Sequence, residues 1–596
     1  MKKGVALIFL ALTAVSCAAL AFTACTPSGE QGDQHTDGHT HTFDTEWVYD
    51  ETSHWHAATC GHDDEVADKS EHTYENAVCT ECGYRYGSDG ALSFELSDDG
   101  SSYSVAKSGF GINMSNLTIP AYHDDLPVTE IAERAFEETT ILESITISDT
   151  VTSIGSYAFL KCTNLMSVDM GDKVTSIGRN AFSECSALTD INLSKKLTSI
   201  DDYTFYDCYS LEYIIIPDSV IEIGDGAFEW CSSLIGVEMP ENLTIIGAGA
   251  FYECFSLTSV NIPNRVTFIG SSVFWNCYKL AEVTLPSRLT SISDSLFYNC
   301  ISLTYVDIPD GVTVIGDSAF DGCEELEMVD LPNGLTTIQY DAFSGCSTLT
   351  QLEIPESVTE IGPWAFSGCS SLISANIPQN ITVISNDLFS GCASLEGINI
   401  PDGVTEIGRS AFSGCASLEN LDIPDGVTSI GSDAFEGCNK LVERQNGIDY
   451  VGKWAVRYSD DNITEINFRE GTIGIADRIF LTSNNIENVT IPDSVTYLGK
   501  EMFYLNDSIK TVTIGSGVTT IPEYTFFMCD SLETVTFTSN VTRIGSFVFF
   551  GCPSLERINY TGTQEQWEQI EIGEYNVSLL NTEINFNYQR QIEKQR

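Results

Sequence analysis

The sequence predicts an α/β solenoid, in which short parallel strands and short helical or 3-10 turns repeat every 23 residues. Two observations predict this fold. Thirteen cysteines from Cys162 to Cys438 follow one another at intervals of 23 residues, and a phenylalanine lies three residues before each of them. A fixed period of this length is typical of stacked repeats, because one unit cannot bury its apolar side chains without a neighbour.

The phenylalanine series is longer than the cysteine series. It runs from Phe136 to Phe435, and it resumes with the same spacing from Phe480 to Phe549. The pattern predicts 14 regular units, one irregular unit at about 440–470, and four further units.

The unit that ends at Cys438 shows how each repeat is expected to fold. Leu421 and Ile423 alternate with polar residues, which predicts a short strand with both side chains inward. Pro424 and the residues after it end this strand at a turn. Ala434, Phe435 and Cys438 recur at helix-like spacing, which predicts a short helix or 3-10 turn that returns the chain.

The cysteines of the repeats are expected to be free thiols that pack as small apolar side chains. Their position also accepts Thr139, Ser483 and Asn506, and fifteen cysteines, an odd number, cannot all form pairs with one another. No histidine follows His123, so neither a Cys/His pair nor a Ser/His/Asp triad can form within the repeats. The sequence therefore predicts that the chain is not an enzyme.

The charge of the chain excludes one class of partner. Of the 596 residues, 85 are acidic and 28 are basic, so the formal net charge is −57. A field of this sign repels phosphate, and neither nucleic acid nor an anionic membrane surface is an expected partner. Membrane contact is expected only through a lipid anchor.

Residues 1–24 have the features of an export signal. Lys2 and Lys3 precede an apolar run that ends at about Phe22. The stretch from Phe22 to Cys25 resembles a bacterial lipobox, and the chain turns polar directly after it, so lipidation at Cys25 is expected. The alternative is ordinary secretion with cleavage nearby. Residues 25–45 are expected to form a flexible tether, which places the mature chain at the cell surface.

Residues 46–86 are expected to form a small module around one structural zinc ion. Cys79 and Cys82 form a CxxCG knuckle, whose two thiolates can converge on a tetrahedral ion. The expected ligands are Cys60, His62, Cys79 and Cys82, with His56 as the alternative to His62. A disulfide among these cysteines is the competing interpretation.

The Phe-x-x-Cys pattern, with Ile-Pro and Val-Thr-x-Ile-Gly as at 423–431, resembles the BspA-like (Treponema pallidum-type) leucine-rich repeats of bacterial surface proteins. The resemblance covers residues 116–560. Residues 87–115 look like the N-terminal cap of such an array, and residues 561–596 like its C-terminal cap and tail. The resemblance implies a right-handed leucine-rich-repeat solenoid with a role in cell-surface adhesion, through binding of host or matrix proteins.

Two functions of different classes remain open. In the first, the solenoid is a surface-tethered binding module for a protein or glycan ligand. In the second, the His-rich segment gathers zinc at the surface and the repeats act only as a spacer. Calcium is a further candidate ion, because Asp307, Asp330 and Glu353 occupy one strand position in consecutive repeats, where like charges repel.

One block of repeats, residues 203–305, differs from the rest in its aromatic content. There the residues after the repeat phenylalanine and after the cysteine are mostly aromatic, whereas later repeats have serine, alanine or acidic residues. A row of exposed rings on an acidic solenoid predicts a recognition surface. The competing interpretations are rings that only pack on each other, and a homodimer contact. The candidate ligand-binding residues are Tyr206, Tyr209, Tyr213, Trp230, Tyr252, Phe255, Trp275, Tyr278, Tyr298 and Tyr305.

Overall fold

The computed structural model describes residues 43–49, 53–58, 66–71, 74–75, 78–79, 91–107, 112, 114–460, 462–481 and 483–589. The chain divides into two compact units, which are Met1–Ala91 and Leu92–Arg596.

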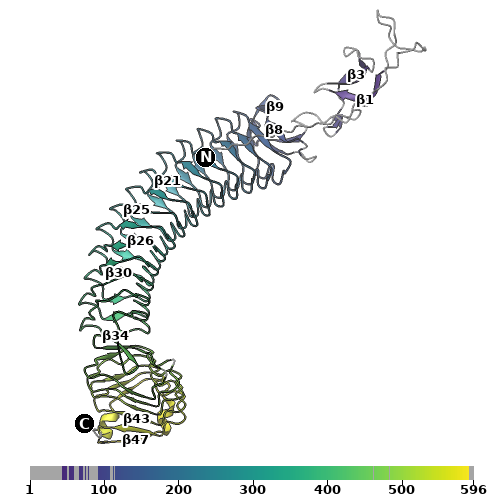
Figure 1. Ribbon diagram of the computed structural model, residues 1–596. Helices are drawn as coiled ribbons and strands as arrows, with labels where there is room; N and C mark the ends of the chain where they lie inside the picture. The colour runs from purple at the N-terminus through teal and green to yellow at the C-terminus, as the bar shows by residue number, and fades with distance from the viewer. Residues whose placement is uncertain are drawn as a thin grey trace, which may run out of the picture. The chain divides into compact units, whose positions relative to one another are not determined.

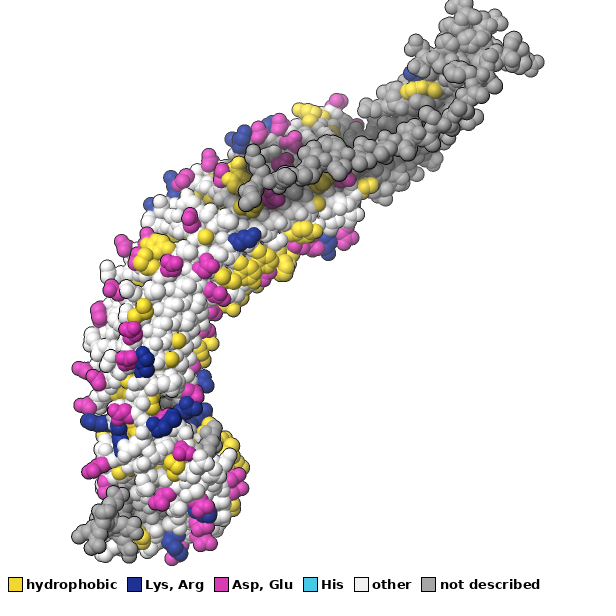
Figure 2. All heavy atoms as spheres, in the orientation of Figure 1, with side chains coloured by type: hydrophobic (Ala, Val, Ile, Leu, Met, Phe, Trp, Pro, Cys, Tyr) yellow, Lys and Arg dark blue, Asp and Glu magenta, His cyan; other side chains and the backbone are white. Residues whose placement is uncertain are grey.

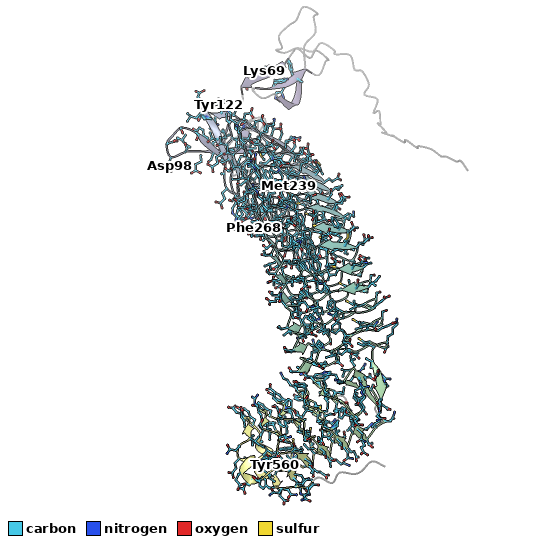
Figure 3. All side chains as sticks on the ribbon, turned by 90° about the vertical axis from the view of Figure 1, so that its left-hand side faces the viewer. Lys69, Asp98, Tyr122, Met239, Phe268 and Tyr560 are labelled. Atoms are coloured by element: carbon cyan, nitrogen blue, oxygen red, sulfur yellow. The ribbon has the colours of Figure 1, made fainter. Side chains whose placement is uncertain are left out.

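The first unit contains a small antiparallel sheet. Its strand order is β1 (Phe43–Tyr49), β2 (Ser53–Ala58) and β3 (Val66–Glu71), and a separate pair is formed by β4 (Tyr74–Glu75) and β5 (Val78–Cys79). On this sheet the Lys69 ammonium lies over the Trp55 ring, 4.8 Å from its centroid (Figure 3).

The second unit is a solenoid whose turns stack on one another (Figure 1). It begins with β6 (Leu92–Leu96), which pairs antiparallel with β7 (Tyr103–Lys107). The parallel arrangement starts with two pairings. β10 (Leu126–Ile131) pairs with β7, and β8 (Asn116–Ile119) pairs with β11 (Ser144–Ile147). The short strand β9 (Tyr122–His123) pairs antiparallel with β10.

Each regular repeat contributes short extended segments to two rows along the solenoid. The first row consists of β11 (Ser144–Ile147), β13 (Ser167–Asp169), β15 (Asp190–Asn192), β17 (Tyr213–Ile215), β19 (Gly236–Glu238), β21 (Ser259–Asn261), β23 (Glu282–Thr284), β25 (Tyr305–Asp307), β27 (Met328–Asp330), β29 (Gln351–Leu352) and β31 (Ser374–Ala375). The second row consists of β12 (Ser153–Ile154), β14 (Ser176–Ile177), β16 (Ser199–Ile200), β18 (Glu222–Ile223), β20 (Ile245–Ile246), β22 (Phe268–Ile269), β24 (Ser291–Ile292), β26 (Val314–Ile315), β28 (Thr337–Ile338), β30 (Glu360–Ile361), β32 (Val383–Ile384), β33 (Glu406–Ile407) and β34 (Ser429–Ile430).

The pairing register confirms the predicted period. Val306 pairs in parallel with Val329, and Ile315 pairs with Ile338, so partners in both rows are 23 residues apart. The same offset of 23 residues gives each residue of one regular turn an equivalent residue in the next turn. Parallel strands in this register place identical side-chain positions directly above one another.

The repeat phenylalanines form two buried stacks, one before and one after the irregular unit. Neighbouring ring centroids from Phe136 to Phe435, and again from Phe480 to Phe549, are 5.0–5.9 Å apart, with ring planes within 4–19° of parallel. Offset stacking of this kind adds to the burial of the rings. These stacks are the centre of the hydrophobic core.

The predicted helical return of each repeat is wrong for the regular repeats. Around Phe412 the chain forms consecutive turns, because Ser410 and Gly414 adopt left-handed backbone angles, with φ of 52° and 77°. Alternate N–H groups then point along the solenoid, and the N–H of Phe412 donates to the Ala434 carbonyl of the next repeat at 2.8 Å. A helix would direct these donors back into its own segment, so it could not join neighbouring repeats in this way.

The fifteen repeat cysteines are free and buried, as predicted. Each thiol donates to the carbonyl oxygen of the phenylalanine 26 residues earlier; Cys346 Sγ, for example, lies 3.3 Å from the Phe320 oxygen. Burial raises the pKa of the Cys369 thiol to about 12, and it also raises the pKa of Cys323 and Cys346. The cysteines therefore pack as small apolar side chains with one weak hydrogen bond.

The irregular unit interrupts the strand rows with two antiparallel pairings. They join β35 (Glu443–Gln445), β36 (Ile448–Val451) and β37 (Trp454–Tyr458), and β37 then pairs in parallel with β39 (Gly474–Ile475). The Asp477 N–H donates to the Ile430 carbonyl at 2.9 Å, so the second row continues across the interruption. Trp454 fills the space beside Gly474, where an added Cβ would lie 2.4 Å from the indole ring.

The last repeats restore both strand rows. The first row continues with β38 (Glu465–Asn467), β40 (Asn488–Thr490), β41 (Thr511–Thr513), β43 (Thr534–Phe537), β45 (Arg557–Tyr560) and β47 (Glu583–Asn585), and the second with β42 (Thr520–Ile521), β44 (Arg543–Ile544) and β46 (Glu571–Ile572). Between these strands lie α2 (Gln564–Trp567) and the 3-10 helix η1 (Val577–Asn581). A search of the described residues finds no helix with the length and apolar character that a membrane span requires.

The left-handed turns can be tested at a glycine. Gly391→Ala should lower the free energy of unfolding by about 1 kcal/mol, because φ at this position is 77°, which an L-residue adopts only with strain. The added methyl group itself has room, since the nearest atom lies 3.5 Å away. Gly403→Ala is the control, at a position without a positive φ and with its nearest neighbour at 3.8 Å. Equal effects of the two substitutions in urea denaturation would contradict the assignment.

The state of the thiols can be tested by alkylation. In the native protein, iodoacetamide should modify none of the fifteen repeat cysteines, because all are buried, and burial also raises the pKa of thiols such as Cys323 and Cys346. After unfolding in guanidinium without reductant, all fifteen should react, as peptide mass spectrometry can measure. Disulfide-linked peptides in the unreduced digest would show that the thiols are paired instead.

Candidate functional site

The turn face is the surface formed in each repeat by the residues that surround the core phenylalanine, such as 409–416 around Phe412. Two outward rows lie on it. The post-Phe row contains the residue that follows each core phenylalanine, and the post-Cys row contains the residue that follows each repeat cysteine. In the repeats between 203 and 305 both rows carry aromatic side chains, and Figure 2 shows hydrophobic side chains gathered in a band on one side of the second unit.

The post-Phe row contains a stack of three rings. The centroids of Tyr252 and Trp275 are 5.8 Å apart with planes at 19°, and those of Trp275 and Tyr298 are 3.8 Å apart with planes at 17°. Tyr206 occupies the same row two repeats earlier and makes an edge contact with Tyr203, at 6.0 Å. The 23-residue period therefore brings together side chains that are distant in the sequence.

The post-Cys row forms a second, shorter stack. The rings of Phe255 and Tyr278 are parallel within 4°, with their centroids 5.2 Å apart. Tyr209 lies in this row two repeats before Phe255. Burial and nearby carboxylates raise the pKa of Tyr252 and of Tyr298, and Tyr278 of the post-Cys row adds to both shifts. The two rows are therefore close enough for their side chains to interact.

Trp230 belongs to neither row. It lies two residues after the core phenylalanine, at a left-handed position with φ of 65°, where later repeats have Gly322 and Gly345. Trp230 is thus a candidate residue beside the two rows and not within either of them. A tryptophan at this position carries backbone strain that glycine would avoid.

Tyr213 and Tyr305 are not part of the turn face. They lie on β17 and β25, in the first strand row, and they are four repeats apart. Each hydroxyl donates to a carboxylate of the next strand, Tyr213 to Glu238 Oε1 at 2.5 Å and Tyr305 to Asp330 Oδ2 at 3.1 Å. These two tyrosines therefore lie on the strand side, apart from the two rows of the turn face.

The degree of exposure separates rings that only pack on each other from rings that can contact a ligand. Tyr209, Trp230 and Tyr278 keep 49%, 42% and 38% of their surface exposed. Tyr206, Tyr252, Phe255, Trp275 and Tyr298 are half-buried. The two stacks thus hold the rings in place while part of their area stays accessible, which a rigid recognition surface requires.

Carboxylates flank the aromatic stacks. Burial, and then the charge of Glu253, raise the pKa of Glu229. At the other end of the stack, burial and then Asp341 raise the pKa of Asp321 to about 6. Within the described part of the chain, Glu229, Glu253 and Asp321 form no ion pair with a lysine or arginine.

The sequence analysis missed two further apolar rows. In the last repeats, Tyr504 stacks on Phe527 at 4.9 Å and Phe527 on Phe550 at 5.4 Å, in the post-Phe row. On the second strand row, the exposed Phe268 pairs with Ile245, and Figure 3 labels Phe268 at the edge of the solenoid. A signal was present for Phe268, because its position is polar in most repeats. A signal was also present for the post-Phe row, because Tyr504, Phe527 and Phe550 are aromatic in consecutive repeats.

The predicted lipidation and zinc sites lie almost wholly outside the described residues. This applies to Cys25, Cys60, His62 and Cys82, and for Cys79 only the backbone is described, in β5. His56 is half-buried on β2, opposite Trp47 and Ala67. In the described segments no three His, Cys, Asp or Glu side chains gather as metal ligands would.

The carboxylates proposed for calcium lie at successive positions of the first strand row. Asp307 pairs directly with Asp330, and both are exposed. Asp330 accepts the hydrogen bond from Tyr305, which supplies one polar partner without an ion. The calcium site stays a prediction.

The flanking carboxylates predict a pH dependence of stability. The pKa of Asp321 is about 6 in the folded protein, above its ordinary value of 3.8, so ionisation opposes folding as the pH rises through this interval and has no effect below it. Asp321→Asn should therefore raise the free energy of unfolding at pH 7 by about 1 kcal/mol, after a discount for solvent screening, and by much less at pH 4. Urea denaturation at both pH values measures this, and an equal effect at the two would contradict the prediction.

Comparison with known proteins agrees with this architecture. The family model described as BspA type Leucine rich repeat region (6 copies) matches residues 110–235, 198–327, 313–442 and 454–571. No curated protein matches the chain.

Several solved structures resemble the chain. A leucine-rich repeat protein from Bacteroides ovatus is 22% identical, with 83% of this chain and 98% of that chain covered and a TM-score of 0.41. A leucine rich cell surface protein from Faecalibacterium prausnitzii is 26% identical, with 81% and 96% covered and a TM-score of 0.36. The T. pallidum leucine rich repeat protein is also 26% identical, with 40% and 88% covered and a TM-score of 0.24. The matches of the family model extend over most of the chain, which therefore belongs to the BspA-type leucine-rich repeat family.

Proposed function

We propose that the chain is a non-enzymatic binding protein of the bacterial cell surface, which holds a protein or glycan ligand on the turn face of repeats 203–305. The pair of aromatic stacks carries this proposal. Stacked tyrosine and tryptophan rings offer a large contact area at a low cost in conformational entropy, and such side chains dominate the energetics of known interfaces.

The fold does not require aromatic rings at these positions. Ser344, Ser367 and Ser390 occupy the post-Phe row in later repeats, and the core phenylalanines beneath them stack as closely as elsewhere. The rings of Tyr252, Trp275 and Tyr298 are therefore additions to a surface that folds without them. Exposed apolar area of this kind is typical of interaction sites.

Export and lipidation at Cys25 are part of the same proposal. The apolar run before Cys25 and the polar tether after it support attachment of the repeats to the outside of the cell. Zinc gathering is not favoured by any contact among the described residues.

The proposal can be tested with a triple variant of the mature ectodomain. Tyr252→Ser and Trp275→Ser reproduce the serines of later repeats, and Trp230→Gly places glycine at a position with φ of 65°. In a screen against matrix proteins and glycans, we expect this variant to bind the selected ligand at least tenfold more weakly. Circular dichroism and the melting temperature should change little, because the removed atoms lie outside the core.

The matched control uses the same row in another part of the chain. Tyr504→Ser together with Phe527→Ser removes two stacked rings of the last repeats and should leave binding unchanged. Wild-type affinity in the triple variant, or an equal loss in the control, would refute docking on repeats 203–305.

A further inference from the structure

The turn face already shows how it binds a cation. In the first repeats the Arg134 guanidinium lies over the Tyr157 ring, 4.4 Å from its centroid. The same group forms an ion pair with Glu137, in the post-Phe row, at 2.6 Å. One arginine thus bridges a ring and a carboxylate that this face presents side by side. Both contacts favour a guanidinium group, which stacks on rings and binds carboxylates.

A second arginine plays a similar part near the other end of the solenoid. Arg478 occupies the position of Arg134 in its own repeat, two residues before the core phenylalanine. It forms an ion pair with Glu501 at 2.8 Å, and Tyr504 is among the groups that raise its pKa, after the hydrogen bond to Glu501. The pairing of an arginine with a carboxylate therefore recurs on this face where the chain supplies the cation itself.

In the aromatic block the Arg179 guanidinium lies over the Tyr203 ring, 5.5 Å from its centroid, but among the described residues no arginine forms an ion pair with the acid beside that ring, Glu229. Gly226 occupies the position that corresponds to Arg134, and Glu229 corresponds to Glu137. A Cβ added to Gly226 would lie 2.4 Å from the Tyr203 ring and 2.9 Å from Glu229 Oε2, so the ring and the carboxylate converge at this point. The next repeat has glycine again, at Gly249.

A carboxylate also follows the rings at the far end of the block. Asp321 follows Tyr298 in the post-Phe row, and the raised pKa of Tyr298 comes from burial and then from the charges of Asp321 and Asp341. Between residues 203 and 305 the chain has eleven acidic and three basic residues. The rings therefore lie between two carboxylate sites that no basic residue of the described chain neutralises by an ion pair.

We propose that the aromatic block binds an extended polypeptide segment that carries arginine, with guanidinium groups at Glu229 and at Asp321 and the intervening chain over the rings of Tyr252, Trp275 and Tyr298. The inference rests on the proposed function and names the partner as a cationic protein. Glu229 and Asp321 are four repeats apart, which is roughly 20 Å at the spacing of parallel strands. An extended chain covers that distance in about six residues.

The separation of Glu229 and Asp321 sets the distance between the two arginines of a test peptide. A fluorescein-labelled peptide with two arginines six residues apart, joined by glycine and serine, should bind the mature ectodomain in fluorescence anisotropy. The peptide with glutamate in place of both arginines should not bind. The peptide with two lysines should bind at least threefold more weakly, because an ammonium group cannot stack on the rings or bind carboxylates in bidentate geometry.

Two double variants separate this site from general attraction to an acidic protein. Glu229→Gln with Asp321→Asn should raise the Kd of the arginine peptide at least tenfold. Glu282→Gln with Asp307→Asn removes the same charge from exposed positions on β23 and β25 and should change the Kd less than threefold. Equal losses in the two variants, or no loss in the first, would overturn the proposal.

The variants also distinguish this inference from the proposed function. A matrix or glycan ligand that is lost in the aromatic triple variant, but retained when Glu229 and Asp321 are neutralised, would uphold docking on the rings and refute a cationic partner. An arginine peptide whose binding ignores the aromatic substitutions would refute the cationic partner on the rings, and the screen against matrix proteins and glycans would still test the proposed function.

Discussion

The stability of each regular turn of the second unit depends on its contacts with the next turn, which is offset by 23 residues. The N–H of one core phenylalanine donates to the following repeat, its ring stacks on the following ring, and its carbonyl accepts from the thiol 26 residues later, as around Phe320. None of these contacts exists within a single repeat. Stability is then a sum of turn interfaces, and a change of register would break the backbone, ring and thiol contacts together.

This constraint divides each repeat into inward positions that cannot vary and outward positions that can. The cysteine position accepts Thr139, Ser483 or Asn506 only because each is small enough for the buried site. The post-Phe row tolerates glutamate, tyrosine, tryptophan and serine on the same backbone. Because neighbouring repeats align these outward positions, a few substitutions in consecutive repeats produce a continuous surface. The aromatic block is such a surface, and its acidic borders give it a preferred partner charge.

Much of this architecture was predictable from spacing alone. The period, the core phenylalanines and the free cysteines follow from residues that recur at fixed intervals. The turns did not follow, because the left-handed positions are occupied by Glu253, Asn276 or Trp230 as readily as by glycine, and these residues give no sign of a positive φ. The turns were therefore predicted as a helix.

The candidate site was predictable in part for the same reason. Tyr252, Trp275 and Tyr298 could be aligned by counting residues, and Tyr213 and Tyr305 could be placed on the strand side, where β17 and β25 carry them. Nothing in the sequence indicates that Gly226 lies where a ring and a carboxylate converge. This placement emerges only when the Tyr203 ring and the Glu229 carboxylate are seen to converge beside it.

Hydroxyl-radical footprinting of the ectodomain, with and without its bound partner, measures directly where docking occurs. The account predicts that oxidation of Tyr209, Trp230, Trp275 and Tyr278 falls on binding. Oxidation of Tyr504, Phe527 and Tyr575 should stay unchanged, because these rings lie in the last repeats. Protection of the last repeats with no change at Trp230 and Trp275 would contradict the claim that the aromatic block is the binding surface.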